Sequence, residues 1–450
     1  MRTDCNTQPI HFTPLGRRQV VADFEGGLIT SDAGALLLRE AAGRLHLFDR
    51  MARAIPDPRE PSMIEHEQRT MLSQRVLGIA CGWEDLIDHQ SLRNDPLFQV
   101  ATDRGVDAAR PLAGASTLCR LENRVGRKAC VELSKLLVEI FIESHPTPPT
   151  ELVLDFDATD DEVHGNQAGR FFHGYYDHYC FLPLYVFCGG RLLVAYLRPS
   201  NIDAARHSRA ILKLLVTRLR QAWPQVKITV RADSGFCRWK MLRWCDRHQV
   251  DYVVGIAKNP ALLRLAGPLM LLASRQFEQS QQKQRIFGEF DYAAGTWDKP
   301  RRTLAKAEHD QRGHNPRFVV VSPGLGGEPR TLYEELFCGR GEMENRIKEQ
   351  QLGLFADRTS CHDFVANQFR VLLSAFAYVL VEHVRRTALA GTELATAQVP
   401  TIRTKLLKVG AVVRTSVRRV VLHLSSSYPL ADLFRQVAAK LTGSLPQPGP

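Results

Sequence analysis

Carboxylates stand at the ends of two apolar strands of this chain, where a metal ion could hold them. Residues 152–159 indicate a covered strand with alternating faces, and Asp155 and Asp157 share one of these faces. Residues 227–232 indicate a second apolar strand, which runs directly into Asp233. A carboxylate beside a covered strand is costly to bury without a cation. Since such hard oxygens suit Mg²⁺, the pattern predicts a metal-dependent site.

A third carboxylate lies on a short predicted helix much later in the chain. Arg340, Glu344 and Lys348 recur every four residues and therefore share one helical face. Taken alone, Glu344 could simply pair with Lys348 across one turn. Because Asp157 and Asp233 occur in the same chain, a shared metal site is the better interpretation.

Several acidic residues compete for the first position. Asp155 lies on the same strand face as Asp157 and is the rival ligand. We favour Asp157 because it stands at the end of the strand. The following Asp160 and Asp161 are expected to be turn carboxylates.

The elements that must position these residues follow a definite order. The predicted strands lie at about 152–159, 180–188, 191–198, 227–232 and 250–256, with helices at 203–222 and 237–249 after the third and fourth strands. By analogy, this is the order of the ribonuclease H-like α/β fold, a mixed sheet in which the first and fourth strands are neighbours. Asp157 and Asp233 would then meet at one edge of the sheet.

The charge balance favours a polyanionic partner. The formal net charge is +11, and residues 401–450 contain a single acid, Asp432. The basic residues of this stretch are Arg403, Lys405, Lys408, Arg414, Arg418, Arg419, Arg435 and Lys440. Such a tail fits phosphate contacts, although a solvated charged face is the alternative.

The cysteines and apolar runs argue against other classes of protein. The 10 cysteines contain no C-x2-C pair, which favours reduced packing cysteines over zinc ligands or disulfides. No run of 18 or more uncharged apolar residues occurs, and residues 1–14 lack the apolar core of a signal peptide. We therefore expect a cytoplasmic protein without a membrane segment.

Three blocks of the sequence resemble the catalytic blocks of bacterial insertion-sequence DDE transposases. They are Leu-Asp-Phe-Asp-Ala-Thr at 154–159, Arg-Ala-Asp-Ser-Gly-Phe at 231–236 and Arg-Gly-Glu-Met-Glu-Asn-Arg-Ile-Lys-Glu at 340–349. Shorter matches are Phe-Glu-Gly-Gly at 24–27, Leu-Arg-Pro at 197–199 and Ala-Asp-Arg-Thr-Ser at 356–360. The subgroup it resembles carries a β insertion before the Glu, and the interval between Asp233 and Glu344 is long enough to hold one.

The resemblance implies a domain plan around a ribonuclease H-like core. The expected segments are a helical DNA-binding region at 1–145, the first part of the core at 150–258, an insertion with β strands at 259–335, the last part of the core with the Glu helix at 336–390, and a basic helical region at 391–450. The catalytic core is thus expected to be split by the insertion.

The resemblance also implies the chemistry. Asp157, Asp233 and Glu344 would be the catalytic residues and would bind two Mg²⁺ ions, with Mn²⁺ able to replace them. Two ions hold the attacking and leaving oxygens of an in-line phosphoryl transfer. A water would cut DNA at the element's end, and the freed 3′-hydroxyl would attack target DNA. Pairing of two ends implies a homodimer on DNA.

The third block departs from the wider family at two positions. That family has a Tyr before its Arg and a Lys seven residues after its Glu. This chain has Phe337 and Gln351 there, which puts the phosphate contacts of those positions in doubt. Lys348 or Arg346 could take over the contact of the missing Lys.

Two further side chains are candidates for contacts with DNA. Arg340 presents a planar fork on the face of Glu344 and could clamp a phosphate. Trp297, in the insertion, could stack on a displaced base, or it could belong to the core of the insertion.

The sequence therefore predicts the transposase of a DNA insertion sequence. It would bind terminal inverted repeats, cleave strands in a metal-dependent reaction and transfer them to target DNA by a cut-and-paste route, in the cytoplasm at the nucleoid. One alternative is a ribonuclease H-like nuclease that does not join strands. Another is an inactive or domesticated DNA-binding derivative, against which the intact carboxylates argue.

Overall fold

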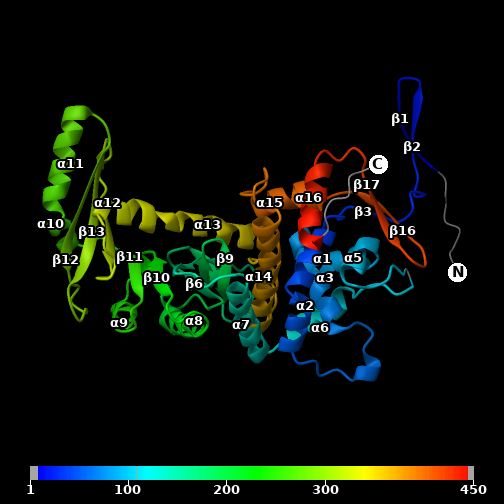
Figure 1. The fold of residues 1–450 in the computed structure, drawn as a ribbon, viewed down its shortest axis with the longest axis horizontal. Coiled ribbons are helices and arrows are strands. Elements are labelled where there is room, and N and C mark those ends of the chain that lie inside the picture. Colours follow the sequence, from blue (N-terminus) through cyan, green and yellow to red (C-terminus); the bar gives the residue numbers. More distant parts are fainter. Residues whose placement is uncertain (1–8, 108, 444–450) are drawn as a thin grey trace. The chain divides into compact units, whose positions relative to one another are not determined.

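The chain divides into two compact units. The computed structural model describes residues 9–107 and 109–443 (Figure 1). Unit 1 consists of Met1–Ala52, Asp57–Leu121 and His383–Pro450, and unit 2 consists of Arg53–Pro56 and Glu122–Glu382. Segments from both ends of the chain thus belong to the same unit. The five consecutive segments expected from the sequence remain a proposal.

Unit 2 is built on a nine-stranded mixed sheet. Its core strands are β4 (Glu151–Ala158), β8 (Leu184–Cys188), β9 (Arg191–Tyr196), β10 (Lys227–Ala232) and β11 (Asp251–Ile256). They lie in the order β9-β8-β4-β10-β11. The strands β4, β8 and β9 form an antiparallel meander, whereas β10 is parallel to both β4 and β11. This is the predicted ribonuclease H-like arrangement, and the fold class is confirmed.

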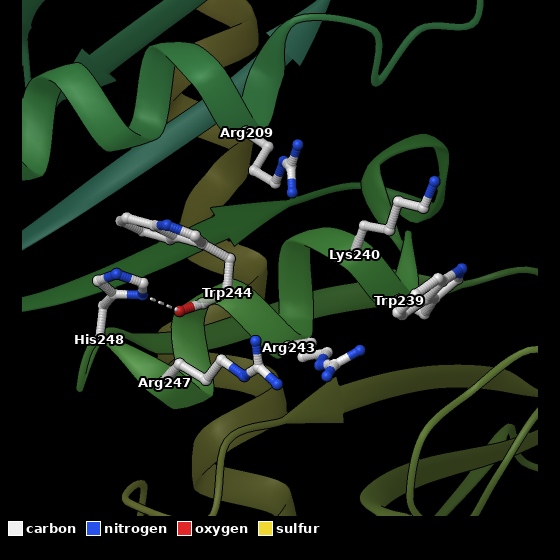
Figure 2. A pocket seen from close by; sticks show the side chains of 7 residues that line it. All are labelled: Arg209, Trp239, Lys240, Arg243, Trp244, Arg247 and His248. Carbon is white, nitrogen blue, oxygen red and sulfur yellow. Dashed lines mark hydrogen bonds between the residues drawn. The ribbon is translucent and has the colours of Figure 1, made fainter.

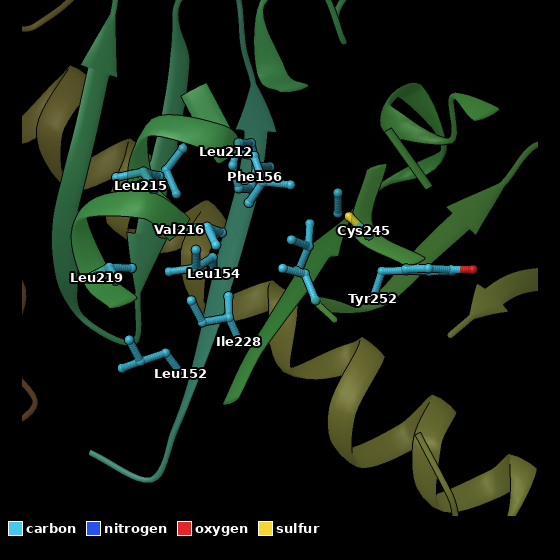
Figure 3. Packing of buried hydrophobic residues seen from close by; sticks show 14 of the residues in the cluster. Leu152, Leu154, Phe156, Leu212, Leu215, Val216, Leu219, Ile228, Cys245 and Tyr252 are labelled. Atoms are coloured by element: carbon cyan, nitrogen blue, oxygen red, sulfur yellow. The ribbon is translucent and has the colours of Figure 1, made fainter. Parts of the chain in front are cut away.

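Alternation along the strands decides what each face of this sheet packs against. Leu152, Leu154 and Phe156 of β4 are buried in one apolar cluster with side chains from three helices (Figure 3). These helices are α7 (Arg127–Glu143), α8 (Ser208–Ala222) and α9 (Trp239–Arg247). Because successive side chains point to opposite faces, Asp155 and Asp157 must face the other side of the sheet.

Helix α14 (Phe364–Thr387) packs against the opposite face, through its part within unit 2. Gln368 accepts a hydrogen bond from Leu197 N at 2.8 Å and donates to Ala195 O at 3.1 Å, and Tyr378 stacks edge-on against Phe187 of β8. By length and composition α14 could cross a membrane, but 89% of its apolar window is buried inside the protein. Such burial is typical of a core helix.

The insertion continues the core sheet. Its strands are β12 (Gln284–Tyr292), β13 (Arg301–Asp310), β14 (Gly313–His314) and β15 (Arg317–Val321), and its helices are α10 (Pro260–Leu265) and α11 (Gly267–Ser280). Strand β15 pairs antiparallel with β11, and α11 packs against β12 and β13. After β15 the chain passes through α12 (Pro329–Thr331) to α13 (Gly341–Lys348).

One predicted strand of the core is divided. The single strand expected over 180–188 is wrong, because β7 (His178–Phe181) ends before Pro183 and β8 begins after it. Proline has no N–H to donate to a ladder, so it favours a break. Strand β7 belongs instead to a small sheet with β5 (Asp161–Glu162) and β6 (Phe171–His173).

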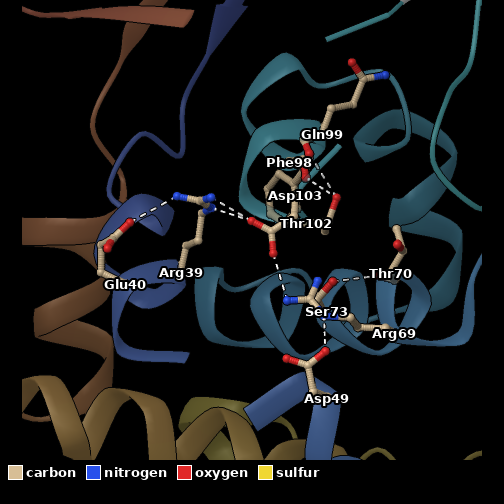
Figure 4. Close-up of polar contacts among 10 residues, drawn as sticks. All are labelled: Arg39, Glu40, Asp49, Arg69, Thr70, Ser73, Phe98, Gln99, Thr102 and Asp103. Atoms are coloured by element: carbon tan, nitrogen blue, oxygen red, sulfur yellow. Dashed lines mark hydrogen bonds and ion pairs between the residues drawn. The ribbon is translucent and has the colours of Figure 1, made fainter. Parts of the chain in front are cut away.

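Unit 1 is mainly helical and joins the two ends of the chain. Its helices are α1 (Ala35–Arg44), α2 (Leu47–Ala54), α3 (Gln68–Cys81), α4 (His89–Leu92), α5 (Pro96–Ala101), α6 (Ala115–Arg124), α15 (Val399–Ile402) and α16 (Ala431–Thr442), of which α2 and α6 run on into unit 2. Helix α1 packs against α3, α5 and α16. Asp103 accepts from both Arg39 and Arg69, and Arg69 also pairs with Asp49 at 2.7 Å (Figure 4).

The strands of unit 1 were not predicted. A hairpin of β1 (Ile10–Leu15) and β2 (Arg18–Ala22) is exposed along its whole length. Strands β16 (Ala411–Thr415) and β17 (Val420–Leu424) form a second hairpin, which β3 (Ile29–Thr30) extends. The expectation of a helical C-terminal region therefore holds for α15 and α16 but not for this hairpin.

Six of the eight basic C-terminal residues divide into two groups; of the other two, Lys405 is exposed and Arg435 pairs with Asp432 at 2.6 Å. Arg403, Lys408 and Lys440 have partners within unit 1: the carbonyl of Ala80, the carboxylate of Asp32 and the carbonyl of Ala388, respectively. The second group, Arg414, Arg418 and Arg419, is exposed on or between β16 and β17. Only part of the predicted basic tail is therefore available for an external anion.

Candidate active site

Asp157 and Asp233 stand at the ends of neighbouring parallel strands. In the register between β4 and β10, Phe156 pairs with Ala232, so the next residues lie at the same level of the sheet. Asp233 caps a short 3-10 turn and accepts a hydrogen bond from Gly235 N at 2.9 Å. The strand order predicted this juxtaposition, and the register shows it.

Glu344 approaches the strand ends through a shared arginine. Arg340 precedes α13, donates to Asp157 Oδ2 at 3.3 Å and forms an ion pair with Glu344, with Nη2 2.8 Å from Oε1. The side chain of Asp157 is only 14% exposed, whereas that of Glu344 is 48% exposed. The guanidinium therefore bridges the buried carboxylate of the sheet and the open carboxylate of the helix.

Electrostatics links all three predicted carboxylates. Burial raises the pKa of Asp157 to about 7, against the opposing charge of Arg340 and with added repulsion from Asp233 and Glu344. The charges of Asp233 and Glu344 therefore act on the same buried carboxyl group. A carboxylate in this environment gains free energy from a nearby cation, and Arg340 supplies one here.

The donor set fits a divalent cation, although the side chains are not gathered around one. Among the residues that the structure describes, no group of three or more His, Cys, Asp or Glu side chains is arranged to hold a metal ion. The oxygens of a desolvated Asp157, facing Asp233 and Glu344, are nevertheless hard ligands that suit Mg²⁺. A metal would have to compete with Arg340 for two of these carboxylates.

Asp155 has a structural partner. It is 2% exposed and forms a two-bond ion pair with Arg231 of β10, in which Nη2 lies 2.8 Å from Oδ2. Arg231 Nη1 also donates to the carbonyl of Leu336 at 2.6 Å. The pair thus joins β4, β10 and the segment that leads to α13. This use of Asp155 supports Asp157 as the ligand in the first strand.

Two glycines allow these close approaches. A Cβ on Gly255 of β11 would lie 3.0 Å from Ser234 N and 3.3 Å from the carbonyl carbon of Asp233. A Cβ on Gly339 would collide with the guanidinium of Arg231. Neither glycine was singled out from the sequence, although a glycine inside a strand, such as Gly255, often marks a close backbone approach.

Residues after the Glu helix hold the loop that follows β4. Gln351 is buried and donates to the carbonyl of Asp160 at 2.8 Å, and Thr359 donates to Asp161 Oδ2 at 2.9 Å. Gln351 therefore has a structural contact at the position of the wider family's Lys. The expectation that Asp161 is a turn carboxylate is wrong, because it is 2% exposed in strand β5.

The other residues predicted to contact DNA differ in their exposure and in their partners. Lys348 is exposed, whereas Arg346 pairs with the buried Glu349 at 3.0 Å. Trp297 packs against two apolar clusters of unit 2, and the guanidinium of Arg301 lies 5.4 Å from its ring centre. This placement supports the core alternative for Trp297.

Exposed aromatic side chains lie in the segment that follows β4. Phe172 and Tyr175 are 53% and 85% exposed, and Arg170 lies over the ring of Tyr179 at 4.4 Å. Burial raises the pKa of the neighbouring Tyr176 to about 12, with contributions from the charges of Asp160 and Asp157. This aromatic group near the carboxylates was not singled out from the sequence.

Replacing Arg231 with alanine should destabilise unit 2 by about 3–5 kcal/mol, because it leaves Asp155 charged and buried without its partner. Urea unfolding followed by tryptophan fluorescence measures this. The matched control is Arg238→Ala, which removes an exposed pair with Asp203 and should cost about 0–1 kcal/mol. Equal costs for the two variants would contradict a structural role for the buried pair.

Without divalent cations, wild-type stability should fall relative to Asp157→Asn as the pH rises from about 4 to 7. In the unfolded chain the Asp157 carboxyl group ionises at its ordinary pKa, whereas in the folded protein its raised pKa makes ionisation unfavourable. The difference in the free energy of unfolding between Asp157→Asn and wild type should grow by on the order of 2–4 kcal/mol over this pH range, measured by urea unfolding in EDTA. Asp203→Asn is the control, because Arg238 lowers the pKa of Asp203. Parallel curves for wild type and Asp157→Asn would refute the shift.

Comparison with known proteins shows the family of this chain. Residues 12–445 match the family model described as Transposase DDE domain group 1. None of the curated proteins compared is significantly similar. The fold is similar to a cryo-EM structure of the piggyBac transposase synaptic complex with hairpin DNA, with a TM-score of 0.45 and 9% identity over 84% of this chain and 80% of that chain. The family match spans nearly the whole chain, and the protein therefore belongs to the DDE transposase family.

Proposed function

We propose that this transposase moves a DNA insertion sequence by cut-and-paste transposition, with Asp157, Asp233 and Glu344 as its catalytic residues. The observation that carries the proposal is the convergence of these carboxylates on one edge of the sheet, where Asp157 and Glu344 share Arg340. Family membership supports the transposase assignment. The proposed substrates are the terminal inverted repeats of the element and a target DNA.

The three carboxylates would hold two divalent cations, Mg²⁺ or Mn²⁺. Bound there, the ions would activate the attacking oxygen and stabilise the leaving oxygen of a phosphoryl transfer. Asp157 lies in β4 and Asp233 directly follows β10, whereas Glu344 lies on the exposed side of α13. The strand residues would therefore define the position of the site, and the helix would complete it.

Arg340 would have two successive partners. Its guanidinium pairs with Asp157 and Glu344, two of the carboxylates that would hold a divalent cation. When cations hold those oxygens, the guanidinium becomes available to the DNA phosphate beside them, and its planar fork matches phosphate geometry. Lys348, exposed on the same helix, would add a second positive charge for the backbone.

Further features support contacts with DNA outside the site. Arg414, Arg418 and Arg419 are exposed in unit 1, where phosphates could reach them. Pairing of two element ends would require a homodimer on DNA. Such a substrate would place the protein in the cytoplasm, at the nucleoid.

Purified protein with Mg²⁺ and DNA carrying the element's ends should cleave the ends and join them to target DNA. Asp157→Asn, Asp233→Asn and Glu344→Gln should each lower the rate at least about 10³-fold, because loss of a metal ligand removes several kcal/mol of transition-state stabilisation. Glu342→Gln, an exposed acid on the same helix, is the control and should stay within a few-fold of wild type. Full activity in any of the three variants would remove that residue from the site. Cleavage without joining would favour a nuclease.

Gly255→Ala should slow cleavage by about 10²-fold, because the new methyl group displaces the backbone at Asp233 and Ser234. Overpacking should cost about 1–3 kcal/mol of stability as well. Single-turnover cleavage and thermal unfolding separate the two effects. Gly190→Ala is the control, because its Cβ would meet only Arg346 Nε at 4.0 Å. An unchanged rate in Gly255→Ala would show that the site tolerates the shift.

A further inference from the structure

A basic surface runs along the outward side of α9, separate from the three carboxylates. It borders a pocket of about 270 Å³ and includes Arg209 of α8 together with Trp239, Lys240, Arg243, Trp244 and Arg247 of α9 (Figure 2). We call these residues the α9 basic surface. Arg209, Lys240 and Arg247 are exposed, and the two tryptophans and Arg243 are half-buried.

Helical spacing creates this surface. Trp239, Arg243 and Arg247 follow one another at intervals of four residues, and Lys240 and Trp244 form the adjacent row. The apolar side of the same helix, with Met241, Leu242 and Cys245, is buried against the sheet. The outward side therefore presents cations in two neighbouring rows.

The surface has little internal counter-charge. Asp246, the one acidic residue of α9, is held by Lys299 at 3.0 Å and by the buried Arg301 at 2.9 Å. Asp298 reaches Arg243 only at 3.9 Å. In the described part of the chain, no ion pair involves Arg209, Lys240 or Arg247. Unneutralised cations this close together favour an external polyanion.

The tryptophans position the cations and leave few free ring faces. Lys240 Nζ and the Arg243 guanidinium carbon lie 5.6 and 5.9 Å from the ring centre of Trp239. Trp244 is stacked on His248, with 4.2 Å between ring centres and an interplanar angle of 17°. Because the rings are occupied in this way, the surface is suited to phosphates and poorly suited to stacking unpaired bases.

We propose that the α9 basic surface binds the sugar-phosphate backbone of duplex DNA next to the cleaved end, without reading its sequence. The proposal rests on the proposed function, which supplies the DNA. Helix α9 begins at Trp239, shortly after Asp233, and packs on the face of the sheet opposite to that of Asp157. A duplex would contact both by passing around the ends of β4 and β10. Charge complementarity favours this partner, and phosphate and sugar oxygens take half or more of the hydrogen bonds in protein–DNA complexes.

The test measures how DNA affinity depends on salt. The variant Arg209→Ala/Lys240→Ala/Arg247→Ala removes three exposed cations, and Lys128→Ala/Lys135→Ala/Arg275→Ala removes three exposed cations from α7 and α11 as the matched control. Fluorescence anisotropy without divalent cations gives Kd for element-end and unrelated duplexes of equal length, between 50 and 200 mM KCl. Thermal unfolding checks that both variants are folded.

Loss of three phosphate contacts should reduce the slope of log Kd against log salt by roughly 2.7, so that the wild type loses about 40-fold more affinity than the variant across this salt range. The loss should be equal for both duplexes, because backbone contacts carry no sequence information. At saturating protein, the single-turnover cleavage rate should remain within a few-fold of wild type.

Three results would overturn the proposal. One is a slope of log Kd against log salt for the triple variant that equals the slope for the control variant. Another is a loss confined to the element-end duplex, which would indicate base reading. A third is unchanged duplex binding together with weakened binding of single-stranded RNA of equal length, which would assign the surface to RNA. If the wild type binds and cuts DNA and the triple variant binds DNA with the same salt dependence, only this proposal is contradicted. If the wild type neither binds nor cuts DNA, the proposed function is contradicted.

Discussion

The buried ion pair between Asp155 and Arg231 determines where the third carboxylate can stand. Arg231 holds β4 through Asp155 and holds the approach to α13 through the carbonyl of Leu336. The buried carboxylate of Asp155 is costly unless its partner stays in place, so these three elements share one geometry. Gly339 is part of the same arrangement, because a side chain there would collide with Arg231. A contact that takes no part in the chemistry thus positions the helix of Glu344.

Local patterns were sufficient for most of the sheet and its helices. Strand β10 has the predicted bounds, α8 and α9 lie within their predicted ranges, and the strand order led to the correct fold class. The strand predicted over 180–188 failed at Pro183, where tertiary pairing redirects the chain. The hairpin of β1 and β2 escaped prediction because an exposed hairpin has no buried face and therefore no apolar alternation to detect.

The candidate site was predictable as a set of residues but not as a set of contacts. Asp155 and Asp157 have the same parity along their strand, so alternation cannot distinguish a structural carboxylate from a ligand. The distinction depends on Arg231, which lies 76 residues away from Asp155 in the sequence. Gln351 is a similar case, since its bond to the carbonyl of Asp160 spans 191 residues. Such long-range partners follow from the tertiary fold, which a single sequence does not display.

The construction of unit 1 from both ends of the chain has a consequence for biosynthesis. Strand β3 pairs with β16, and α1 packs against α16, so the first helices emerge from the ribosome long before their partners. Unit 2 is complete once Glu382 has been made, whereas unit 1 must wait for the remaining residues. The carboxylates are therefore assembled on nascent chains whose other unit is unfinished. A premature stop after unit 2 would leave the three carboxylates in a protein that lacks the C-terminal part of unit 1.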